Sequence, residues 1–177
     1  MGINFATGGT QSYPGNQIKS TTHSLNGTSS ATWESLPNGI TNIIISCEEV
    51  STGNNDVPWY IQIGDTGGGY ITSGYTGTWL HQNLSGGAGG RTQGSGFEIY
   101  QSGSGYYSTG LCHLQLHVTG DYHKWVCTVM QGQRNSEHIA TGGGYRTISG
   151  SSNLDKVRLS CSSGNWDSGN ATLHYSF

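Results

Sequence analysis

Apolar and polar side chains alternate with a period of two along almost the whole chain, which is the pattern of half-buried β-strands. Clusters of Gly, Asn, Asp and Ser, as at 37–39 and 119–121, separate the alternating runs and are typical of turns. No window of ten or more residues carries apolar side chains at helical spacing. The pattern predicts strands at 17–24, 31–36, 40–50, 59–64, 70–79, 97–100, 111–119, 123–130, 137–141, 154–161 and 171–177.

We therefore expect an all-β protein, a jelly-roll-like antiparallel β-sandwich of about ten or eleven short strands. A chain of 177 residues fits one domain, which we place at 16–177. Residues 1–15 have little to bury and end at Pro14-Gly15, so we expect an extended N-terminal arm that a neighbouring molecule orders. The glycine-rich segment 84–96 predicts a long flexible contact loop, and Gly142-Gly143-Gly144 predicts a bend between strands.

Composition, charge and the length of apolar stretches separate this chain from three other classes of protein. Thirty glycines with 10% charged residues suggest disorder, but five Trp and ten Tyr are typical of a folded core. A net charge of −3 with only seven Lys and Arg argues against nucleic-acid binding. The longest apolar stretch, around 43–45, is far too short to span a membrane. The weakly charged polar surface is common in proteins that pack against copies of themselves.

Four widely spaced cysteines fall on the apolar side of predicted strands, where a thiol behaves as a small buried hydrophobe: Cys47, Cys112, Cys127 and Cys161. No C-x-x-C pair gives the spacing of a zinc site. We expect four reduced core thiols, with one or two disulfides as the alternative. Reduced thiols fit a protein made and folded in a cytoplasm.

The other residues that could carry chemistry do not form a recognisable site. His113 and His117 lie on one side of a strand but about 13 Å apart, too far to share a metal ion, and we expect them to face solvent or a partner. Glu48 and Glu49 are adjacent in a strand, so we expect them on opposite faces rather than as a catalytic pair. No nucleophile motif is present. We therefore expect no enzyme activity, no metal and no cofactor.

The aromatic residues fall into two groups. Trp33, Trp59 and Trp125 alternate with polar residues and are expected in the core. A second group lies near glycine-rich loops or in the arm and is expected at an interface, either between subunits or with a ligand. With the neighbouring residues Ile3 and Arg91 included, the interface candidates are Ile3, Phe5, Tyr13, Trp79, His81, Arg91, Tyr106, Tyr107 and Trp166.

Several stretches resemble virion structural proteins of marine and cyanobacterial phages. The opening Gly-Ile-Asn-Phe-Ala-Thr-Gly-Gly-Thr-Gln-Ser, residues 2–12, is similar to the "INFADGSTQ"-type leader of such proteins. The body resembles a β-sandwich module that recurs in them, and the matching stretches are 36–43, 61–68, 72–75, 154–159 and 166–171. Together they span most of the chain.

The resemblance implies a virion component, made in the bacterial host cytoplasm, that forms a homotrimer, needs no cofactor and binds other virion proteins. Within that class we expect a capsid decoration (cement) protein that binds the coat lattice and whose arm threads into a partner. The alternative is a tail fibre or appendage protein that recognises host surface glycans. A free lectin-like module is a third reading, without specific support.

Overall fold

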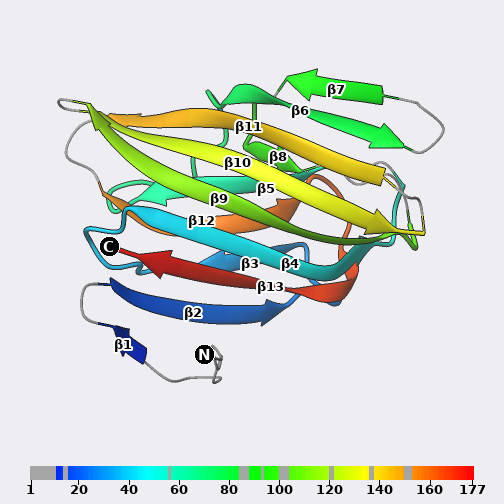
Figure 1. The fold of residues 1–177 in the computed structure, drawn as a ribbon, viewed down its shortest axis with the longest axis horizontal. Coiled ribbons are helices and arrows are strands. Elements are labelled where there is room, and N and C mark those ends of the chain that lie inside the picture. Colours follow the sequence, from blue (N-terminus) through cyan, green and yellow to red (C-terminus); the bar gives the residue numbers. More distant parts are fainter. Residues whose placement is uncertain are drawn as a thin grey trace.

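The computed structural model of this chain describes residues 11–13, 16–55, 57–83, 88–92, 94–99, 104–119, 122–135, 138–149 and 153–177. These ranges are built from β-strands and contain no helix (Figure 1). The strands of these ranges are β1 (Gln11–Tyr13), β2 (Asn16–Ser24), β3 (Ser30–Trp33), β4 (Asn42–Thr52), β5 (Trp59–Asp65), β6 (Thr76–Asn83), β7 (Ala88–Thr92), β8 (Phe97–Ile99), β9 (Tyr107–Thr119), β10 (Tyr122–Arg134), β11 (His138–Ser149), β12 (Leu154–Cys161) and β13 (Trp166–Ser176).

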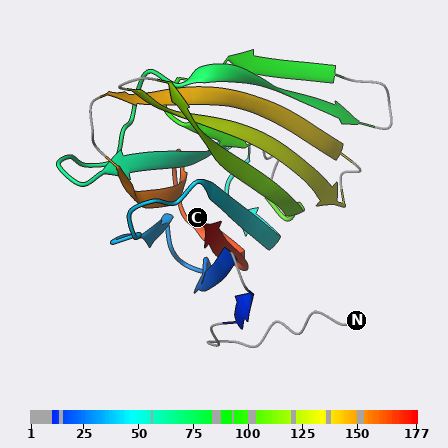
Figure 2. The same cartoon turned by 60° about the vertical axis from the view of Figure 1, so that its left-hand side comes forward.

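The strands form two antiparallel sheets that pack face to face (Figure 2). The larger sheet has the order β1-β2-β13-β4-β9-β10-β11-β6-β7, and the smaller has the order β3-β12-β5-β8. The chain passes repeatedly from one sheet to the other, as from β2 to β3 and from β12 to β13, whereas β9, β10 and β11 form a meander within the larger sheet. The last two strands take interior positions, β12 between β3 and β5, and β13 between β2 and β4.

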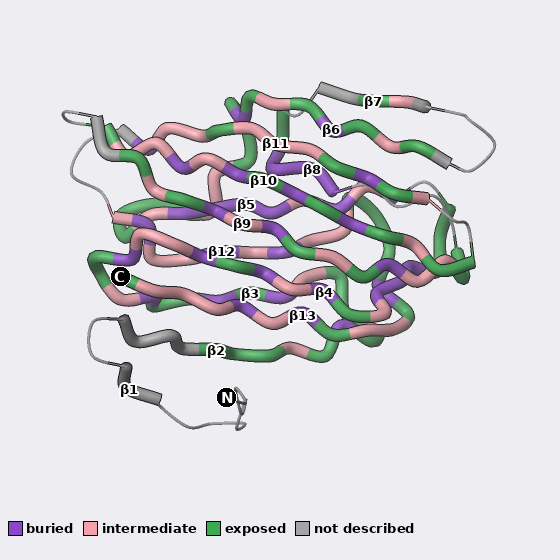
Figure 3. Tube along the Cα trace, in the orientation of Figure 1, coloured by how far each residue is buried: buried purple, intermediate pink, exposed green. Residues whose placement is uncertain are grey.

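The core lies between the sheets and follows directly from the alternation in the sequence. Buried and exposed positions alternate along β4, β9 and β10 (Figure 3). Ile43 and Ile45 of β4 are fully buried, as are Ile61 and Ile63 of β5 in the facing sheet. The sequence places Trp33, Trp59 and Trp125 in the core, and this prediction is confirmed, because each is at most 4% exposed.

The glycine run 142–144 lies in the middle of β11, so the predicted bend at this position is wrong. Gly142 pairs with Trp79 of β6, and a Cβ on Gly142 would come within 2.6 Å of the Trp79 Cβ. The absence of a side chain at Gly142 leaves room for the Cα and Cβ of Trp79, a residue that is only 2% exposed. Glycine is required here by a close approach within the sheet and not by a turn.

The predicted all-β antiparallel sandwich is confirmed, and each of the eleven predicted strands corresponds to an observed one. Two observed strands were not expected. Strand β7 lies inside segment 84–96 and pairs with β6, so the prediction of a loop along that whole segment is wrong. Strand β1 lies inside the predicted arm and pairs with β2, while residues 1–10 lie outside the described residues. The division at residue 15 stays a prediction.

Candidate functional site

Five large aliphatic side chains point outward from neighbouring strands of the larger sheet and form what we term the apolar patch. Met130 of β10 lies opposite Leu111 of β9 on one side and Thr141 of β11 on the other, and Thr141 lies opposite Leu80 of β6. Ile139 and Ile44 extend this row on β11 and β4. The exposed fractions are Ile44 39%, Leu80 61%, Leu111 49%, Met130 64% and Ile139 65%.

The surface around the apolar patch is almost free of charge. The outward positions beside it on β10 and β11 carry uncharged side chains such as Thr128 and Thr141. Among the described residues of β4, β9, β10 and β11, outward-pointing charged side chains lie only near the two ends of this face, with Lys124 at one end and Arg134 at the other. Lys124 Nζ lies 4.3 Å from the centre of the Tyr145 ring. A neutral, partly apolar face of this kind is suited to contact with another protein surface.

A shallow groove of about 480 Å³ continues from the apolar patch toward one end of the sheet. Gly132 of β10 forms its floor, between Thr109 of β9 and Ile139 of β11. A Cβ placed on Gly132 would meet no atom within 4 Å, so the missing side chain creates the depression. At its end the Arg134 guanidinium lies 4.7 Å from the centre of the Tyr107 ring, its direct cross-strand partner.

A β-bulge in β4 brings a carboxylate to this groove. The register of β4 against β9 shifts between Cys47 and Val50, both of which are buried, and Glu49 adopts a positive φ of 51°. As a result Glu49 reaches Arg134 with a 2.8 Å ion pair, while Glu48 is exposed. The expectation that Glu48 and Glu49 lie on opposite faces of a regular strand is wrong because the bulge adds a residue between two inward positions. The groove thus combines an aromatic ring, a hydroxyl and an ion pair.

The outer face of the smaller sheet carries a different arrangement, which we term the polar network. Arg158 of β12 donates from Nε and Nη2 to Gln62 Oε1 of β5 at 3.0 and 2.6 Å. Gln62 Nε2 donates to the carbonyl of Ser95 at 2.7 Å. The Arg158 guanidinium also lies 4.4 Å from the centre of the Tyr70 ring, whose hydroxyl donates to Glu34 at 3.0 Å. Burial, and then the bond to Glu34, raise the pKa of Tyr70 to about 12.

Two of the predicted interface residues lie in the core, so their prediction is wrong. Trp79 is 2% exposed and points between the sheets from β6. Trp166 begins β13, is 1% exposed and packs edge-on against Trp59, with ring centres 6.4 Å apart. Both residues follow or precede glycine-rich segments in the sequence, but their side chains fall on the inner side of a strand.

The remaining predicted residues are scattered. His81 lies half-buried beside Trp79 and His138, and burial, then the His138 ring, lower its pKa. Tyr106 is half-buried, and Tyr107 lines the groove. The other candidates lie outside the described residues or have side chains outside them: Ile3, Phe5, Tyr13 and Arg91. Of the predicted set, the structure places Tyr107 at the candidate site.

The four cysteines are free thiols, three of them buried and Cys161 half-buried. Burial raises the pKa of Cys47 and Cys161 to about 12. Within the described ranges, no three His, Cys, Asp or Glu side chains are grouped closely enough to hold a metal ion. In the same part of the chain we find no helix with the length and apolar character needed to cross a membrane.

Sequence reasoning missed the apolar patch and the groove partners Glu49 and Arg134. A signal for the patch was present, because each patch residue is the neighbour of a buried apolar residue in the same strand. The pairs are Ile43-Ile44, Trp79-Leu80, Leu111-Cys112, Val129-Met130 and Ile139-Ala140. Since successive side chains in a strand point to opposite faces, two adjacent apolar residues place one of them outside the core. The Glu49–Arg134 pair depends on the bulge and has no such signal.

Comparisons of the chain with protein-family models, with curated proteins and with solved structures found no match.

Proposed function

We propose that this chain is a structural component of a bacteriophage particle, a capsid decoration protein that binds the coat lattice. The observation that carries the proposal is the apolar patch on a nearly uncharged sheet face. Five aliphatic side chains exposed side by side gain free energy when a partner removes them from water, at roughly 25 cal/mol per Å² of buried apolar area.

Two features of the sequence support the choice of a phage particle. The leader at 2–12 and the module-like stretches of the body resemble phage virion proteins, and this resemblance implies a homotrimer. We assign the apolar patch to contact with the coat subunit and the first fifteen residues to a second, extended contact with the particle. In this proposal the protein is not an enzyme and uses no cofactor.

The experiment that tests this function is reconstitution on particles that lack the protein. Purified chain should bind such particles at a copy number in the hundreds, in proportion to the coat lattice. A copy number of a few dozen or fewer would contradict a capsid location and favour the tail. Deleting residues 1–15 should leave a folded domain that no longer joins the particle, whereas unfolding of this truncated chain would contradict the arm assignment.

The second candidate function, a tail fibre or appendage protein that recognises host surface glycans, is favoured by the groove. The groove offers a carboxylate, a guanidinium and a hydroxyl as hydrogen-bonding groups beside the Tyr107 ring. These groups suit a sugar ring, which presents hydroxyls at its edge and an apolar face to an aromatic side chain. Binding of purified protein to a glycan array would favour this function over the capsid role.

A further inference from the structure

Two thiols on the inner face of the larger sheet lie in direct contact. Cys112 of β9 and Cys127 of β10 are each 1% exposed, and their Sγ atoms are 3.0 Å apart. We propose that Cys112 and Cys127 form a cross-strand disulfide when the protein meets a small oxidant, which makes this pair a covalent modification site in the core. The proposal does not depend on the proposed function.

The geometry of the pair is close to that of a disulfide. Cys112 lies opposite Val129 and Cys127 lies opposite Leu114, so the two cysteines are diagonal neighbours on one face. Diagonal neighbours are about 7–8 Å apart between Cα atoms, slightly beyond the range of about 4.4–6.8 Å seen in disulfides. The side chains already turn toward each other, however, and bond formation requires the sulfurs to approach by only about 1 Å.

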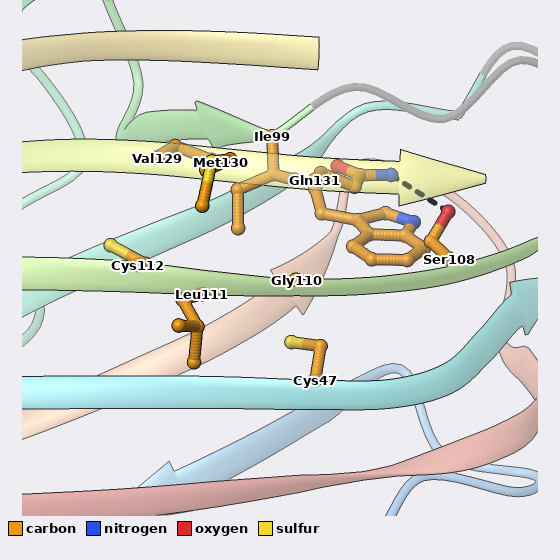
Figure 4. A pocket seen from close by; sticks show the side chains of 10 residues that line it. Cys47, Ile99, Ser108, Gly110, Leu111, Cys112, Val129, Met130 and Gln131 are labelled. Carbon is orange, nitrogen blue, oxygen red and sulfur yellow. Dashed lines mark hydrogen bonds between the residues drawn. The ribbon is translucent and has the colours of Figure 1, made fainter. Parts of the chain in front are cut away.

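A small cavity beside Cys112 supplies room for this adjustment. It has a volume of about 10 Å³ and lies between the sheets, lined among others by Cys47, Cys112 and Val129. Figure 4 shows Cys112 on β9 and Cys47 on β4 beside it. Its size is close to the smallest space that holds one water molecule, about 10–15 Å³. Small shifts of Cys112 therefore do not collide with a fully packed wall.

The reaction with a peroxide balances without any group from elsewhere in the protein. The sulfur of one thiol attacks a peroxide oxygen, the O–O bond breaks, and a sulfenic acid and one water form when the oxidant is hydrogen peroxide. The sulfur of the second thiol then attacks the sulfenic sulfur, the S–O bond breaks, and a disulfide and a second water form. Two thiols lose two electrons and two protons in total, and one hydrogen peroxide is reduced to two waters.

Burial makes both redox states of this pair persistent. Desolvation, and then the contact with Cys127, raise the pKa of the Cys112 thiol well above its ordinary value, so little reactive thiolate is present at neutral pH. The cross-link therefore forms slowly in the folded protein. Once formed, it is equally shielded from attack by thiol reductants.

The positions of the other two cysteines explain why we expect the disulfide between Cys112 and Cys127 alone. Cys47 lies on the same inner face, on strand β4. Ile45 of β4 pairs directly with Cys112, and Cys47 lies two residues further along β4. Cys47 is therefore the diagonal neighbour of Cys112 on the side away from β10. Cys161 lies on β12 of the smaller sheet. The 3.0 Å contact selects Cys127 over Cys47 as the partner of Cys112.

Mass spectrometry of the full chain tests the proposal. The purified protein is incubated with hydrogen peroxide, unfolded in guanidinium chloride with iodoacetamide, digested and mapped. We expect alkylation of Cys47 and Cys161 and a single intramolecular cross-link between the peptides of Cys112 and Cys127. Alkylation of all four thiols, sulfinic acid without a cross-link, or a cross-link that contains Cys47 or Cys161 would each overturn the proposal.

Variants and thermal unfolding add a second measurement. The variant Cys47→Ser/Cys161→Ser should still form the cross-link, whereas Cys127→Ser should not. The cross-linked wild type should melt roughly 5–10 °C above the reduced protein, since the bond restricts the unfolded chain. A melting temperature that does not rise would overturn the proposal that the folded core accommodates this cross-link. If either variant fails to fold, the peptide map of the wild type decides.

Discussion

The outer face of the smaller sheet carries the polar network of Arg158, Gln62, Tyr70 and Glu34, whereas the outer face of the larger sheet carries the apolar patch. The hydrogen bonds of the network join side chains to one another and to the backbone of the same chain. The aliphatic groups of the patch have no covering layer among the described residues. Polar groups can be satisfied within one molecule, but apolar groups on the open face of a sheet are removed from water only by a second surface.

We infer that the polar network on the smaller sheet stabilises the fold, whereas the apolar patch on the larger sheet serves association with a partner. The polar network holds a buried glutamine, because Gln62 is only 5% exposed, and an unpaired group at this position is costly. Residues of the patch are 39–65% exposed and contribute little to the folded monomer. Substitutions on the two faces should therefore separate these properties.

The largest effect is expected from a charge in the apolar patch. Met130→Asp should weaken attachment to the particle by at least about 100-fold, since it places a desolvated carboxylate at the centre of the interface. Co-sedimentation with particles that lack the protein measures the binding. The matched control is Thr32→Asp, which adds the same charge to the outer side of the smaller sheet. Equal loss of binding in both variants would show that the patch is not the docking surface.

Removal of the guanidinium from the polar network should have the largest effect on stability. Arg158→Met leaves Gln62 Oε1 without its two donors and should cost about 2 kcal/mol of unfolding free energy, or roughly 4–8 °C in melting temperature. Urea unfolding followed by tryptophan fluorescence measures it. Arg134→Met on the larger sheet breaks an exposed ion pair and should cost less than about 1 kcal/mol. Similar costs for the two variants would refute the distinction between the faces.

Alkaline pH should weaken the polar network. The pKa of Tyr70 is raised to about 12 in the folded state, above the value of about 10 in an unfolded chain. The folded state therefore binds the Tyr70 proton more tightly, and the stability from this group is complete below about pH 10 and is lost as the pH rises through about 12. Tyr75, whose pKa burial also raises to about 12, contributes a loss in the same window.

The variant Tyr70→Phe removes the contribution of Tyr70 to this loss. Its melting temperature should fall less steeply than that of the wild type between about pH 10 and pH 12. Differential scanning calorimetry across this range gives both curves. Parallel curves would mean that Tyr70 does not retain its proton in the folded state.

The smallest change in stability is expected at the floor of the groove. Gly132→Thr adds a side chain where a Cβ meets no atom within 4 Å, and threonine suits a strand better than glycine. The variant should be more stable by roughly 0.5 kcal/mol while its side chain fills the groove. Loss of glycan-array binding with intact particle attachment would separate the groove from the patch. A clear loss of stability would contradict the open geometry at Gly132.

The fold could be predicted from the sequence because alternation within a strand is a local property. Ile43, Ile45 and Cys47, for example, lie on the inner face of β4 as their spacing indicates. Strand β7 could not be predicted in this way, since its glycines provide no alternation and it exists as the pairing partner of β6. The burial of Trp166 depends on Trp59, more than one hundred positions away, which no local pattern reveals.

The candidate site was less predictable than the fold. The sequence predicts Tyr107 as an interface residue, but its position in the groove depends on Arg134 of β10 and on the bulge that turns Glu49 toward it. A bulge changes which residues share a face, and the residue types around 48–49 do not indicate that a bulge occurs there. The outward members of the adjacent apolar pairs were accessible to reasoning, and their exposure follows from strand geometry alone.

The interior positions of β12 and β13 have a consequence for how the chain is made. A ribosome synthesises these two strands after the eleven others described here, yet β2 and β4 meet only through β13, and β3 and β5 only through β12. During translation, the earlier strands therefore expose four unpaired edges until β12 and β13 emerge. The nascent chain completes both layers in one late step, and before that step it depends on chaperones or on rapid elongation to avoid pairing with the wrong neighbour.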